Sequence, residues 1–136
     1  MTPHPARPPE DPALPETAPF ADWIGLRTES AAGGRALLRL EPRGELLNRR
    51  AVVHGGVLAT MLDSAMAHAC RTVEGVRELG GTTDLHVQFL RPASGSLSAR
   101  GWVEHAAGTL AFCRGEVRDA GGALVASGSA SVRLRR

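Results

Sequence analysis

Apolar side chains recur at helical spacing along residues 55–73, where Val, Leu, Met, Ala and Cys fill positions three, four and seven apart. This period predicts a long helix that is packed deeply within the fold. A shorter stretch at residues 20–26 has similar spacing, but Gly25 interrupts it. We therefore expect only one or two helical turns there, laid against the body of the protein.

Alternation of apolar and polar residues predicts strands on both sides of the long helix. One strand precedes the helix and four follow it, at residues 35–41, 82–90, 97–105, 109–118 and 123–134. Turn residues between the last three strands predict hairpins. The whole pattern predicts an α+β fold, in which a curved antiparallel sheet of five to six strands wraps around the long central helix. The free edges of such a sheet favour pairing with a second copy.

The prolines divide the chain into two parts. Residues 1–19 contain seven of the nine prolines and almost no apolar periodicity, which predicts a disordered N-terminal segment. Residues 20–136 then form one folded domain of ordinary size. The chain has no apolar run long enough to cross a membrane and no signal-peptide layout, so we expect a cytoplasmic protein without a membrane partner.

Composition and charge narrow the function classes further. The formal net charge is only +2, and the sixteen basic residues are all arginines scattered along the chain, so nucleic acid is not an expected partner. Cys70 and Cys113 lie where small apolar residues belong, and we interpret both as reduced packing residues. The five histidines show no metal-ligand spacing, and no metal or other cofactor is expected.

Candidate chemistry is concentrated in the long helix. Asp63 is a carboxylate among apolar residues, and a buried carboxylate needs a partner, a raised pKa or a function. One interpretation is structural, with Asp63 bonded to a backbone amide or an arginine. Gly55 and Gly56 open the helix, where backbone amides lack helical partners and favour an anion. His54, just before them, is either a capping residue or a catalytic one.

The joint spacing of these residues resembles the hotdog-fold acyl-coenzyme A thioesterases. The branch is the phenylacetate-degradation (PaaI-like) branch of the 4-hydroxybenzoyl-CoA thioesterase superfamily, and the match covers residues 20–134. The motifs that carry it are Asn48-x5-His54-Gly55-Gly56-x6-Asp63, Thr82, the strand end at residues 87–92, and Asp119-x-Gly121. One position departs from the family pattern, because Ala51 stands where the family commonly has glycine.

The resemblance implies roles for individual residues. Asp63 would be the catalytic carboxylate, and Gly55 would donate its backbone amide to the thioester oxygen. Asn48, His54 and a hydroxyl from Thr82 would assist, with the adjacent Thr83 as the alternative hydroxyl. The residues expected to contact substrate are Gly56, Leu58, Met61, Leu62, Thr83 and Arg91.

The expected activity is hydrolysis of aryl or short- to medium-chain acyl-CoA, with Asp63 as general base or nucleophile. Gly55 and Asp63 are too far apart on one helix to hold the same thioester, so we expect a site shared across a homodimer, with dimers pairing into a tetramer. Two alternatives stay open: an acyl-CoA-binding module without catalysis, and a dehydratase or hydratase. Those enzymes carry an Asp and a His five residues apart, a spacing that Asp63 and His68 share deeper in the helix.

Overall fold

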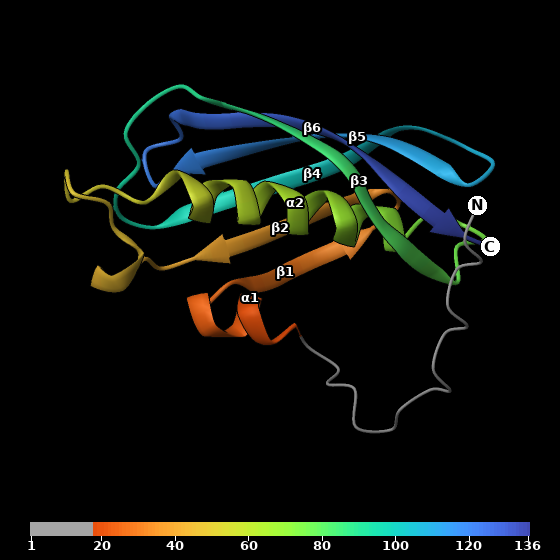
Figure 1. Cartoon of the computed structure of the whole chain (residues 1–136), viewed down its shortest axis with the longest axis horizontal. Coiled ribbons are helices and arrows are strands. Elements are labelled where there is room, and N and C mark those ends of the chain that lie inside the picture. Colours follow the sequence, from red (N-terminus) through yellow and green to blue (C-terminus); the bar gives the residue numbers. More distant parts are fainter. Residues whose placement is uncertain (1–17) are drawn as a thin grey trace, which may run out of the picture.

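The computed structural model describes residues 18–136, in which a six-stranded antiparallel sheet curves around one long helix (Figure 1). In chain order the elements are α1 (Pro19–Ile24), β1 (Arg27–Ala32), β2 (Arg35–Leu40), the 3-10 turn η1 (Gly44–Leu46), α2 (Gly55–Arg71), β3 (Glu78–Phe89), β4 (Leu97–Ala107), β5 (Leu110–Asp119) and β6 (Leu124–Arg135). The sheet order is β1-β2-β4-β5-β6-β3. This arrangement confirms the predicted α+β hotdog architecture.

The N-terminal prediction is only partly covered by the structure. The disordered segment expected at residues 1–19 lies outside the described residues, except for Ala18 and for Pro19, which begins α1. Within residues 18–136, no helix combines the length and the hydropathy needed to cross a membrane. The same part of the chain has no group of three His, Cys, Asp or Glu side chains that could hold a metal ion.

The central helix α2 has defined signals at both ends. It begins where the Nδ1 atom of His54 accepts a hydrogen bond of 2.8 Å from the Gly56 N–H. It ends at Arg71, where the N–H of Thr72 bonds the Ala69 carbonyl. One face packs against the sheet and is fully or almost fully buried: Val57, Leu58, Met61, Leu62, Ala65, Met66, Ala69 and Cys70. The predicted helix is therefore confirmed, with its end two residues earlier than expected.

The structure adds one strand, β1, that alternation does not predict. Its sequence, Arg-Thr-Glu-Ser-Ala-Ala, offers no apolar face, and all six residues are exposed at an edge of the sheet. Strand β3 begins at Glu78, four residues before the predicted start, and pairs with β6 and not with β4, the next strand along the chain. The last three strands, β4, β5 and β6, thus form a meander. Strand β3 crosses α2 and forms the far edge of the sheet (Figure 1).

Aliphatic, methionine and cysteine side chains fill the core, and none of the five aromatic residues is in it. Small residues let the helix approach the sheet closely at Gly101 of β4. A Cβ atom added there would lie 2.5 Å from the Ala65 carbonyl oxygen and 2.6 Å from the Met66 backbone nitrogen. Because both contacts are to backbone, only a shift of α2 away from the sheet could relieve them.

We therefore expect Gly101→Ala to lower the free energy of unfolding by about 3 kcal/mol, because it separates helix from sheet. Urea denaturation followed by circular dichroism measures the effect. Gly44→Ala is the matched control, since an added Cβ at Gly44 meets nothing within 4 Å. Equal stabilities of the two variants would show that the helix and the sheet are not in tight contact at Gly101.

Candidate active site

A cavity of about 510 Å³ lies at the start of α2, between the loop that precedes the helix and the loop after β3. Its wall is mostly apolar, and among residues 18–136 the charged side chains that line it are two arginines. The residues that line it are Asn48, Arg50, Val52, Val53, Gly55, Leu58, Phe89, Leu90, Arg91, Pro92 and Ala93. A concave apolar wall with cationic groups suits a ligand that combines an apolar part with an anionic part.

The backbone N–H of Gly55 is the unused donor at this end of the helix. Within residues 18–136 it makes no hydrogen bond, whereas His54 holds the N–H of Gly56 through Nδ1 and that of Val57 through its carbonyl. An amide at the first helical position also experiences the positive end of the helix dipole. Gly55 can therefore donate to an oxygen that carries negative charge. His54 itself is exposed and caps the helix, as one of its two interpretations predicted.

Asn48 shapes the loop beside the cavity. Its Oδ1 atom accepts hydrogen bonds from the backbone N–H groups of Arg50, at 2.9 Å, and of Val52, at 3.4 Å. The loop also brings Ala51 to a φ of 60°, in the left-handed region. Ala51 thus has the backbone conformation that glycine prefers, at the position where the family commonly has glycine. The side chain of alanine makes this conformation cost about 1 kcal/mol of stability.

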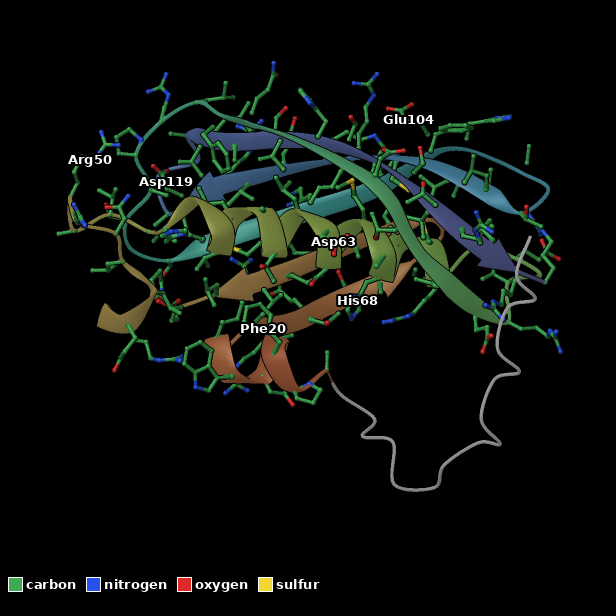
Figure 2. The ribbon with its side chains drawn as sticks, in the orientation of Figure 1. Phe20, Arg50, Asp63, His68, Glu104 and Asp119 are labelled. Atoms are coloured by element: carbon green, nitrogen blue, oxygen red, sulfur yellow. The ribbon has the colours of Figure 1, made fainter. Side chains whose placement is uncertain are left out.

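Asp63 lies near the middle of α2 on the face turned away from the core (Figure 2). It is half-buried, and its Oδ1 atom accepts a hydrogen bond of 2.6 Å from the Thr82 hydroxyl on β3. Among residues 18–136 no ion pair involves Asp63. The adjacent Thr83 hydroxyl bonds the Ser131 carbonyl at 3.1 Å instead, because the sheet register shifts between Thr82 and Asp84. Thr82, and not Thr83, therefore contacts the carboxylate.

The amide and the carboxylate do not meet within one chain. Gly55 and Asp63 are eight residues apart on a continuous helix, which separates their Cα atoms by about 12 Å. Figure 2 shows the Arg50 loop beside the helix start, while Asp63 lies farther along the helix. Asp63 is also not part of the cavity wall. A single chain therefore holds the Gly55 amide and the Asp63 carboxylate at two separate places on the helix.

The structure separates the residues expected to contact substrate. Leu58 and Arg91 line the cavity, but Met61 and Leu62 are 0% exposed and do not. Helical periodicity places them on the face that packs against the sheet, and full burial keeps them from any ligand. Gly56 also lies outside the cavity wall, and its N–H is occupied by His54.

Phe89 lies nearest to Gly55 among the cavity residues that sequence analysis did not assign to the site. Its ring atoms lie 3.2 and 3.3 Å from the position of a Cβ atom added at Gly55, and the side chain is 56% exposed. Alternation along β3 correctly puts Phe89 on an apolar strand face. It could not show that the end of β3 crosses the helix start.

His68 does not form a pair with Asp63. Its Nδ1 atom lies 2.8 Å from the Ser64 carbonyl oxygen, one turn earlier in the same helix. Five residues of helix turn the two side chains by about 140° relative to each other. The structure therefore contains no Asp and His dyad of the kind that the hydratase alternative would use at this position.

Comparison with known proteins identifies the family. The sequence model of the thioesterase superfamily matches residues 51–126. A candidate esterase of Halobacterium salinarum is 32% identical to this chain over 125 residues, which cover 84% of the chain and 83% of that protein. The chain belongs to the thioesterase superfamily. As a member of this superfamily, it is a hydrolase with thioesterase or esterase activity.

Solved structures place this thioesterase superfamily member among PaaI-like proteins. A conserved protein of Pseudomonas aeruginosa superposes with a TM-score of 0.83 at 29% identity, covering 88% of this chain and 95% of that chain. A variant of the phenylacetic acid degradation protein PaaI of Thermus thermophilus gives 0.77 at 28% identity, covering 88% and 100%. The resemblance to PaaI-like hotdog thioesterases is thereby confirmed.

The strained loop gives a test of its own. Ala51→Gly should raise the free energy of unfolding by about 1 kcal/mol and the melting temperature by about 4 °C, because glycine adopts positive φ without a steric penalty. Differential scanning calorimetry measures both quantities.

Gly108→Ala is the matched control, since Gly108 has a φ of 59° and nothing lies within 4 Å of an added Cβ atom. It should shift the melting temperature by a similar amount in the opposite direction. A loss of stability in Ala51→Gly would contradict the left-handed conformation at residue 51.

Proposed function

We propose that this protein is an acyl-CoA thioesterase whose active sites are shared between two subunits. The observation that carries the proposal is the unused Gly55 N–H, at the positive end of α2 and in the wall of an apolar cavity. This donor would hold the thioester carbonyl oxygen and stabilise the negative charge that develops there. The hydrolysis products are a free acid and CoA.

Asp63 supplies the second chemical group. It removes a proton from an attacking water, and the C–S bond then breaks with release of CoA. Alternatively, it attacks the carbonyl carbon itself, the C–S bond breaks with release of CoA, and water then opens the resulting mixed anhydride. The Thr82 hydroxyl holds Oδ1 at 2.6 Å, so the other carboxylate oxygen is directed toward the reacting groups. This hydrogen bond fixes the orientation of the carboxylate, as a catalytic group needs if it is to meet the substrate in the reactive geometry.

The cavity wall accounts for the two ends of an acyl-CoA. Leu58, Phe89 and Leu90 offer apolar contact to an aryl or short- to medium-chain acyl group. Arg50 and Arg91 can form charge-assisted hydrogen bonds with the nucleotide phosphates. The apolar side chains and the two arginines of the wall thus support a substrate that joins an apolar acyl group to an anionic carrier.

The edge strand β3 explains how two chains could complete one site. In the proposed shared site, the Gly55 amide and the Asp63 carboxylate are the two half-sites of each chain. Strand β3 contacts both of them, because Thr82 bonds Asp63 and Phe89 packs against Gly55. Antiparallel pairing of two β3 strands about an axis between residues 85 and 86 would set Thr82 opposite the partner's Phe89. Each Asp63 would then face the helix start of the other subunit. The exposed edge of β3 favours such pairing, and two dimers would associate into the expected tetramer.

Replacing Asp63 by asparagine tests the carboxylate. Asp63→Asn keeps the shape and an oxygen for Thr82 but removes the base, and we expect kcat to fall about 10³-fold on every acyl-CoA substrate. A thiol-release assay over acetyl-, hexanoyl-, benzoyl- and phenylacetyl-CoA measures the rates. Ser64→Ala, at the neighbouring half-buried position of the same helix, should retain full activity.

Two results would contradict the proposal in different ways. Undiminished turnover in Asp63→Asn would remove this carboxylate from the mechanism. Tight binding of acyl-CoA by the unaltered protein, with no turnover of any ester, would identify a binding module instead of an enzyme.

Replacing Gly55 by proline tests the amide. Proline has no N–H and is well accepted at the first helical position, and His54 already has the extended conformation that a following proline needs. We expect Gly55→Pro to lower kcat by about 10²- to 10³-fold. Gly55→Ala is the control, because it adds the same Cβ atom beside Phe89 and keeps the N–H.

Mixing the two inactive variants tests whether sites are shared. Refolding Asp63→Asn with Gly55→Pro in equal amounts should restore about one quarter of the normal activity, because half of the dimers are mixed and each has one intact site. Analytical ultracentrifugation confirms the dimers. A mixture that stays inactive although mixed dimers form would show that each subunit works alone.

A further inference from the structure

The two cysteines of the chain face each other in the core, at the end of α2 that lies away from the cavity. The Sγ atoms of Cys70 and Cys113 are 3.2 Å apart, although the residues are 43 positions apart in the sequence. Their exposed fractions are 0% and 2%, and both thiols are free. The proposed hydrolysis uses neither of them. The pair therefore needs an explanation of its own.

The surroundings of the pair permit a covalent bond. A disulfide requires the sulfur atoms to approach by about another 1.2 Å, which is within the reach of side-chain rotation and small backbone shifts. Cys70 is in the last turn of α2, directly before Arg71, where the hydrogen-bonded helix ends. Cys113 is near the start of β5, three residues after Leu110. Helix ends open more readily than helix centres, which gives a water-sized reagent transient access.

The two thiols are also chemically unequal. Either sulfur can donate the hydrogen bond between the two thiols; with Cys113 as the donor, this bond lowers the pKa of Cys70, although burial opposes the effect. The same hydrogen bond and burial both raise the pKa of Cys113. Cys70 is therefore the thiol that reaches the nucleophilic thiolate form first, and Cys113 is placed to react second.

We propose that Cys70 and Cys113 are a redox-active dithiol, which hydrogen peroxide converts into a disulfide between α2 and β5. The Cys70 thiolate attacks one peroxide oxygen, the O–O bond breaks, and a sulfenic acid forms with release of hydroxide, which becomes water. Cys113 then attacks the sulfenic sulfur, the S–S bond forms, and a second water leaves. The two thiols lose two electrons in total, and one peroxide is reduced to two waters. A dithiol reductant reverses the change.

The disulfide would act as a staple across the fold. It closes a loop that contains β3 and β4, and so restricts the unfolded chain. It also fixes the C-terminal turn of α2 against the sheet. Neither cysteine lines the cavity or contacts Asp63, so the oxidised protein should keep its catalytic residues in place.

Intact-mass spectrometry of the full chain after treatment with hydrogen peroxide tests the proposal. We expect a loss of about 2 Da, no thiol left for alkylation after denaturation, and full recovery of both thiols with dithiothreitol. The melting temperature of the oxidised form should exceed that of the reduced form by roughly 10 °C. These measurements need no substitution, so they do not depend on whether a variant folds.

Single substitutions test the order of the two steps. Cys113→Ser keeps a hydrogen-bond donor beside Cys70, so the sulfenic acid on Cys70 should persist there and react with dimedone, whereas Cys70→Ser should leave Cys113 unmodified. Two thiols that still alkylate after peroxide treatment and denaturation would show that both cysteines only pack in the core. A gain of about 32 Da in the unaltered chain, from a sulfinic acid on either residue, would equally overturn the proposal.

Discussion

The structure depends on the close contact between one face of α2 and the concave side of the sheet. Gly101 lets the backbone of β4 approach the helix backbone at Ala65, and aliphatic side chains of moderate size fill the space on both sides. Burial of this face fixes the rotation of the helix. Asp63 is thereby turned outward toward Thr82, and the helix start is turned toward the cavity. The packing of the core therefore also determines the positions of Asp63 and of the helix start.

The same constraint keeps the Gly55 amide and the Asp63 carboxylate apart within one chain. A straight helix separates its first amide from a carboxylate eight positions later by more than the length of a thioester group. Neither end can bend toward the other while the helix stays packed on the sheet. The edge strand β3 contacts Asp63 through Thr82 and lies beside Gly55 at Phe89. The strand that contacts both groups is thus also one of the two strands, β1 and β3, whose outer edge faces no neighbouring strand of this chain.

The sequence allowed most of the fold to be predicted, because α2 and the five strands β2, β3, β4, β5 and β6 have clear periodicity. It failed for β1, whose polar residues form an edge strand through backbone hydrogen bonds alone. At the site, helical spacing correctly placed Met61 and Leu62 on an apolar face. It could not show whether the sheet or a ligand covers that face. The proximity of Phe89 to Gly55 depends on a strand crossing, and periodicity within one element carries no information about it.

The lack of aromatic rings in the buried core has a practical consequence for optical spectroscopy. Trp23 and Trp102 are the sole indole groups, and neither belongs to the buried core. Trp23 lies instead beneath the guanidinium group of Arg43, 4.7 Å from its ring centre. Intrinsic fluorescence of this protein therefore monitors its outer surface. Melting of the interior would change the emission spectrum little, while any molecule that settles over these indoles would change it directly.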